Sequence, residues 1–206
     1  NYGSGSLSGT NDAGADHNTA IGQDAMSGNL TSAADGNSAI GNKALFTNTT
    51  GYYNSALGNG ALYTNLGGNH NTAVGNGSLY NNSGGGYNTA VGSLALEANT
   101  TGSYNIASGW NALADNTTGT GNIASGVLAL YKNISGTYNV ANGYAALLNN
   151  TSGIYNIASG YSALYNNTAG NYNTASGYDA LKGNTTGDYN IASGYQAMSS
   201  GTNTGD

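Results

Sequence analysis

The chain of 206 residues contains no cysteine and no proline, and its only cations are Lys43, Lys132 and Lys182. Without cysteine it can form neither a disulfide nor a thiolate metal site. With three cations against nine acidic residues, it lacks the basic surface that binding to nucleic-acid phosphates requires. It has no apolar run long enough to predict a membrane-spanning helix. These absences exclude several classes of protein and leave the internal repeat as the main source of information.

The repeat has the pattern Asn-x-Ala-x-Gly, and its first interval is 19 residues long, whereas the other nine intervals are 17. We number the columns of the repeat from its Asn: column three is always Ala, column five is always Gly, and column nine is Leu or Met. The pattern predicts a repeat domain over residues 16–206, preceded by a lead-in over residues 1–15. The eleven copies begin at Asn18, Asn37, Asn54, Asn71, Asn88, Asn105, Asn122, Asn139, Asn156, Asn173 and Asn190.

Each copy is too short for two packed helices and a turn, and its Gly and Asn residues are poor helix formers. Columns one to five alternate as a strand does, and Asn-Thr-Thr-Gly at columns twelve to fifteen is typical of a turn. We therefore expect one coil per copy: a strand, a corner at Gly, a second short strand through Ala-Leu-Tyr, and the turn. Stacked in register, about 11 coils make an all-β parallel β-solenoid on the order of 50 Å long.

The only large side chain common to the copies is the aliphatic one at column nine, so we expect it to face the Ala of column three inside a thin coil. The predicted core ladder consists of Leu45, Leu62, Leu79, Leu96, Leu113, Leu130, Leu147, Leu164 and Leu181.

Columns two and four share the other side of the strand. The first five copies carry Thr or Ser at column two and an aliphatic residue at column four, and from the sixth copy this order is mostly reversed. The aliphatic residue that is lost at column four is thus replaced by one at column two. A face exposed to solvent would not need this replacement, so we expect the face to pack against identical chains in a side-by-side homotrimer. The predicted trimer-facing residues are Ile21, Ile40, Leu57, Val74, Val91, Ile106, Ser108, Ile123, Ser125, Val140, Asn142, Ile157, Ser159, Ile191 and Ser193.

Aromatic residues occupy two further columns. Column seventeen carries mostly Tyr, and His17 and His70 stand in its place in two copies, so we expect them to replace Tyr in an aromatic row. One interpretation of the aromatic rows is glycan binding, and the other is stacking between coils that stiffens the rod. The possible glycan-binding aromatics are those of column six: Trp110, Tyr144, Tyr161, Tyr178 and Tyr195.

No catalytic set, cofactor motif or metal-ligand spacing is present, and we expect the chain not to be an enzyme. The nine acidic residues fall in varied columns, which does not favour repeat-bound calcium or a glycosidase pair. Asn-x-Ser/Thr sequences recur at the turn, where turn chemistry explains them and N-glycosylation is the alternative. Their Asn residues include Asn29, Asn48, Asn99, Asn116, Asn133, Asn150 and Asn184.

The sequence Asn-Thr-Ala-Ile-Gly followed by x-x-Ala resembles the coils of YadA-like trimeric autotransporter adhesin heads. The longer form, Tyr-Asn-Thr-Ala-x-Gly-x-x-Ala-Leu-Tyr-x-Asn-Thr-Thr-Gly, is similar to repeats of phage tail fibres and bacterial surface fibres. The resemblance covers residues 16–206. It implies a left-handed β-roll with three chains side by side and columns two and four facing the trimer axis.

The resemblance implies a structural or adhesive segment of an extracellular trimeric fibre, at a cell surface or on a virion. Its partner is expected to be the chain itself, with a cell-surface glycan or matrix protein as a possible ligand, and neither nucleic acid nor membrane. Two alternatives remain. An ice-binding solenoid would need an unbroken Thr array, but Thr holds column two in only four copies. A polysaccharide-processing β-solenoid enzyme is the other.

Overall fold

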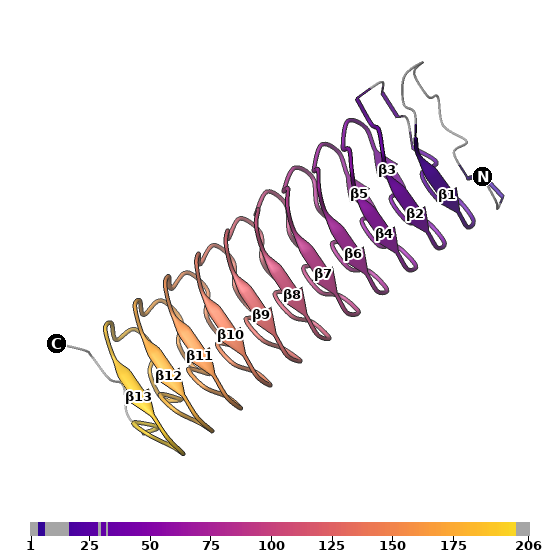
Figure 1. The fold of residues 1–206 in the computed structure, drawn as a ribbon. Coiled ribbons are helices and arrows are strands. Elements are labelled where there is room, and N and C mark those ends of the chain that lie inside the picture. Colours follow the sequence, from indigo (N-terminus) through magenta and orange to yellow (C-terminus); the bar gives the residue numbers. More distant parts are fainter. Residues whose placement is uncertain (1–3, 7–16, 29, 32, 201–206) are drawn as a thin grey trace.

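The computed structural model shows a straight rod of stacked coils, with Thr19–Ile21 near one end of the rod and Ile191–Ser193 near the other (Figure 1). The structure describes residues 4–6, 17–28, 30–31 and 33–200. Most of the predicted lead-in, residues 1–15, lies outside them. The described residues contain no helix, and therefore none that could cross a membrane. The predicted all-β parallel solenoid with coils of about 17 residues is confirmed.

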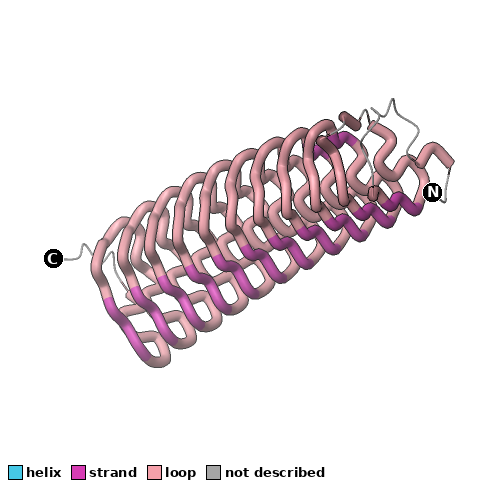
Figure 2. Tube along the Cα trace, turned by 45° about the horizontal axis from the view of Figure 1, so that its top comes forward, coloured by secondary structure: helices cyan, strands magenta, loops and turns pink. Residues whose placement is uncertain are grey.

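One long parallel sheet runs along the rod and is formed by columns two to four of every copy (Figure 2). Neighbouring strands pair column with column, as Ala90 pairs with Ala107. A second, two-stranded sheet lies in the second and third coils (β3 and β5). The strands are β1 (Thr19–Ile21), β2 (Ser38–Ile40), β3 (Thr47–Asn48), β4 (Ser55–Leu57), β5 (Thr64–Asn65), β6 (Thr72–Val74), β7 (Thr89–Val91), β8 (Ile106–Ser108), β9 (Ile123–Ser125), β10 (Val140–Asn142), β11 (Ile157–Ser159), β12 (Thr174–Ser176) and β13 (Ile191–Ser193).

The predicted second strand through Ala-Leu-Tyr is wrong, because columns eight to ten form a tight turn. Leu130, for example, has a φ of 52°, a left-handed conformation that costs about 1–2 kcal/mol in an L-residue. Successive side chains of a strand point to opposite sides, yet Ala129 and Leu130 are both fully buried. The turn therefore brings two consecutive side chains into a narrow interior. It still pairs with the next coil, since Leu45 N donates to Ala61 O at 2.8 Å.

The interior of the rod is one continuous apolar cluster of the Ala of columns three and eight and the Leu or Met of column nine. The nine leucines of the predicted core ladder lie in it with no exposed surface: Leu45, Leu62, Leu79, Leu96, Leu113, Leu130, Leu147, Leu164 and Leu181.

Gly at column five is the corner that allows the coils to approach each other. Gly109 has a φ of 138°, and a Cβ placed on it would lie 2.5 Å from the carbonyl oxygen of Gly126 in the next coil. Both reasons for a glycine, a positive φ and a close backbone approach, therefore hold at the same position.

Two rows of buried Asn side chains complete the interior, one at column one and one at column twelve. Asn122 Nδ2 donates to Asn105 Oδ1 in the preceding coil at 3.2 Å and to Gly136 O in its own coil at 2.8 Å. Asn133 Nδ2 donates to the same Gly136 O at 3.0 Å. The turn bond expected from the Asn of column twelve is thus present, and the glycine carbonyl joins both rows. Inside the rows each amide serves as donor and acceptor, and Asn184 Oδ1, at the C-terminal end of the column-twelve row, is the exception among the described residues, since it is buried without a partner.

Candidate functional site

The outer face of the long sheet, formed by the side chains of columns two and four, has an aliphatic side chain beside a polar one in all coils but that of β12, and it is open to solvent in the single chain. Ile40, Leu57 and Ile123 are 42%, 49% and 41% exposed. All fifteen predicted trimer-facing residues lie on this outer face, and each is exposed or half-exposed. The structure therefore gathers them into one stripe along the rod. That further copies of the chain cover this stripe stays a prediction.

The composition of the outer face changes between β7 and β8. Val91 pairs with Ser108 at column four, and Thr89 pairs with Ile106 at column two. The aliphatic row thus moves sideways by two columns without leaving the face. In the same coils column six passes from polar side chains to Trp110 and then to tyrosines.

The tyrosines of column six stack on one another. Ring centroids of Tyr144, Tyr161, Tyr178 and Tyr195 follow each other at 5.0, 5.0 and 5.3 Å, with interplanar angles of 15° or less. The predicted stacking between coils is therefore confirmed. Both faces of Tyr161 and Tyr178 are covered by neighbouring rings, so a sugar cannot stack on them and only their edges and hydroxyls are presented. Trp110 lies outside this stack, because Val127 occupies column six between it and Tyr144.

The aromatic row of column seventeen is stacked from His70 to Tyr104 and from Tyr138 to Tyr189, and it is interrupted at Gly121. His70 lies within it, 4.8 Å from the ring of Tyr87, as the sequence predicts. For His17 the prediction of a place in the aromatic row is wrong. The next coil has Gly36 at this column, and His17 Nδ1 instead lies 3.3 Å from Asp35 Oδ1 on the surface.

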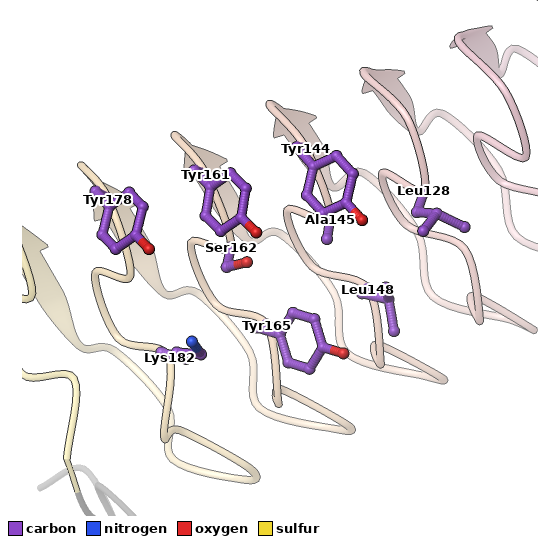
Figure 3. Close-up of a pocket in the computed structure, with 9 residues that line it drawn as sticks. All are labelled: Leu128, Tyr144, Ala145, Leu148, Tyr161, Ser162, Tyr165, Tyr178 and Lys182. Atoms are coloured by element: carbon purple, nitrogen blue, oxygen red, sulfur yellow. The ribbon is translucent and has the colours of Figure 1, made fainter.

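A groove of about 440 Å³ runs beside the stacked tyrosines of column six (Figure 3). One wall consists of the stacked tyrosines, the floor is formed by column seven, and the other wall by column ten. Sequence reasoning missed columns seven and ten, although the aromatic residues at column ten of the early copies were a usable signal. The groove is lined by Leu128, Tyr144, Ala145, Leu148, Tyr161, Ser162, Tyr165, Tyr178 and Lys182.

An ion pair stands at the C-terminal end of this groove. Lys182 Nζ lies 3.0 Å from Asp179 Oδ2 and 6.0 Å from the ring centroid of Tyr165. The hydrogen bond that Lys182 donates to Asp179 raises the pKa of Lys182 above its ordinary value. The other oxygen of Asp179, Oδ1, is buried without a hydrogen-bond partner. The groove thus ends at the Lys182 cation, whereas Asp179 is buried and does not line the groove.

The same columns form a smaller groove of about 140 Å³ in the N-terminal half, between Asn59, Asn76 and Tyr80. Here the column-six wall is polar, and its amides bond to each other. Asn59 Nδ2 donates to Asn42 Oδ1 at 3.0 Å, and Asn76 Nδ2 donates to Asn59 Oδ1 at 3.3 Å. This wall presents side chains whose hydrogen bonds are already partly made.

The Asn-x-Ser/Thr sequences do not present their amides to solvent. Asn48, Asn99, Asn116, Asn133, Asn150 and Asn184 are fully buried in the column-twelve row, and Asn29 lies outside the described residues. A glycan on these buried nitrogens would replace the hydrogen bonds that hold adjacent coils, such as that from Asn133 Nδ2 to Asn116 Oδ1 at 2.7 Å. The folded coil therefore favours turn chemistry over glycosylation as the reason for the pattern.

In the part of the chain that the structure describes, no group of three or more His, Cys, Asp or Glu side chains could hold a metal ion. Comparison with known proteins finds no family model, curated protein or solved structure that matches this chain.

Proposed function

We propose that this chain is a structural and adhesive segment of an extracellular trimeric fibre, and not an enzyme. The observation that carries the proposal is the outer face, where an exposed or half-exposed aliphatic side chain recurs in every coil except that of β12, which has Thr174 and Ser176 instead. Contiguous apolar surface of this kind marks an interaction site in soluble proteins. The resemblance of the repeat to surface-fibre and tail-fibre coils supports the extracellular location.

The axial repeat of the stripe favours another copy of the chain as its partner. The outer face offers the same pair of columns once per coil, and a partner must match that rise to stay in contact over eleven coils. A second copy of the same solenoid matches it without adjustment. Three copies around an axis would cover all three outer faces, and the result would be a closed, symmetric rod.

The mass of the chain in solution tests the proposal. We expect sedimentation equilibrium to give three times the 20.5 kDa of one chain. The double substitution of Ile123→Asn and Ile157→Asn on the outer face should lower the association constant at least tenfold, because about 1.5–3 kcal/mol of burial per side chain is lost. Ile134→Asn is the matched control, since Ile134 is 49% exposed at the turn and outside the outer face.

A chain that stays monomeric at all concentrations would overturn the trimer. Equal association constants for the double variant and the control would show that the outer face is not the interface.

A further inference from the structure

The groove of the C-terminal half presents a row of unused hydroxyls. Tyr144, Tyr161 and Tyr178 line one wall with their hydroxyls on the groove side (Figure 3). Within the described residues these hydroxyls make no hydrogen bond to the protein. The stacked rings hold the tyrosines 5.0 Å apart, so one hydroxyl is offered per coil in a straight line.

The remainder of the groove is amphipathic. Leu148 and the ring of Tyr165 give an apolar wall, and the buried Ser162 adds a hydroxyl to the floor. Ligand sites of this kind combine an apolar lining with a few polar groups that fix orientation. A sugar ring has matching parts, with C–H groups on its faces and hydroxyls at its edge.

The N-terminal stretch of the same columns has no tyrosine row at column six and has a smaller groove. Its column-six amides are bonded to one another, as Asn59 is to Asn42 at 3.0 Å, and its groove is about 140 Å³ against about 440 Å³. The two stretches share backbone and floor column, so the difference lies in the side chains alone. This contrast assigns ligand binding to the C-terminal stretch.

We propose that the groove between columns six and ten, from Leu128 to Lys182, binds an extended β-linked polysaccharide that lies along the rod. A ligand that uses the tyrosine row must be straight and present a hydroxyl-bearing edge about once per coil. An extended β-1,4-linked chain of hexoses meets this condition, whereas an α-1,4-linked chain coils away from a straight groove. The inference deepens the adhesive role proposed above and rests on it.

Calorimetric titration of the whole chain with cellohexaose and with N-acetylchitohexaose tests the inference, with α-linked maltohexaose as the comparison. We expect at least one β-linked hexasaccharide to bind and maltohexaose not to bind. The double variant Tyr161→Phe and Tyr178→Phe keeps both stacked rings and removes two hydroxyls, so its affinity should fall about tenfold or more. The matched control is Tyr155→Phe with Tyr172→Phe, which makes the same change in the column-seventeen row and should leave the affinity unchanged.

Absence of binding by both β-linked sugars, equal affinity for maltohexaose, or equal affinity of the two double variants would each overturn the inference. Sedimentation of the same samples separates this outcome from failure of the fibre proposal. A trimer that binds no sugar removes the groove site and leaves the fibre. A monomer that binds cellohexaose removes the trimer and leaves the groove.

Discussion

The first five and the last six copies of the repeat have the same interior and different surfaces. Both halves carry Ala at column three, Leu or Met at column nine and two rows of buried Asn, and the positive-φ Gly of column five recurs in both. Their outer columns differ, since apolar residues sit mainly at column four in the first half and mainly at column two in the second. The geometry of one coil fixes the residue types at the inward columns, whereas the outward columns can exchange apolar and polar residues.

The aromatic residues show the same exchange on the two walls of the groove. In the N-terminal half the stack is at column ten, where Phe46, Tyr63 and Tyr80 follow each other at 4.9 and 4.6 Å. In the C-terminal half it is at column six. Moving the stack across the groove changes what each half offers to a ligand and leaves the coil unchanged.

The largest expected effect tests the shared interior at its corner. Gly109→Ala should lower the free energy of unfolding by at least about 3 kcal/mol, because the new Cβ meets a backbone carbonyl and the positive φ becomes strained. Gly58→Ala in the first half should cost a similar amount, since Gly58 makes the same approach to Gly75. Ser108→Ala, one residue from Gly109 and exposed in the single chain, is the control and should cost far less than Gly109→Ala. Equal tolerance of Gly109→Ala and Ser108→Ala in urea unfolding would contradict the corner role.

The second largest effect is expected from substitutions in the core ladder. Leu62→Ala and Leu130→Ala lie in opposite halves, both side chains are fully buried, and each should cost about 2–5 kcal/mol. Urea unfolding measures both. A loss below about 0.5 kcal/mol at both positions would place column nine outside the core, and a large difference between them would mean that the halves do not share one interior.

Substitutions on the outer face should weaken the assembly to different degrees in the two halves. If three chains pack on this face, Val74→Ser with Val91→Ser should weaken the assembly by about 1–2 kcal/mol per chain, because the N-terminal half has an aliphatic centre. Ser108→Ala with Ser125→Ala should weaken it less, since we expect the serines of column four to line a narrow polar axis that holds ordered water. The concentration dependence of the sedimentation coefficient measures both. Equal weakening by the two pairs would remove the distinction.

The smallest expected effect concerns a carboxyl in the C-terminal half. Partial desolvation raises the pKa of Asp115 above 3.8 although the residue is exposed, and the nearby Lys132 offsets part of this increase. A raised pKa in the folded state means that ionisation favours unfolding, so this contribution to stability is lost as the pH rises from 3.8 through the folded pKa. Asp115→Asn should therefore be more stable than the parent by a few tenths of a kcal/mol at pH 7, because the group is exposed. The advantage should vanish near pH 3, and an advantage that persists there would have another cause.

The sequence predicts the solenoid well because identical columns must stack in register. The spacing of Asn-x-Ala-x-Gly gives the strand, the glycine corner and the inward Leu. It does not predict the conformation of the Leu turn, since alternation cannot show that Ala129 and Leu130 both face inward. The residue types found at each column also do not reveal the groove, because the groove depends on how columns six, seven and ten come together around that turn.

The hydrogen bonds between coils determine how the rod responds to force. They run along its axis, as from Leu45 N to Ala61 O, and β1 and β13 lie at opposite ends of the rod. Tension applied to a single chain therefore loads one interface between coils at a time and peels coils from an end. Each released coil adds about 50 Å of extended chain, so the extension trace would show evenly spaced steps. Side-by-side packing on the outer face would resist this peeling, since a coil would then have to leave its neighbours in the assembly as well.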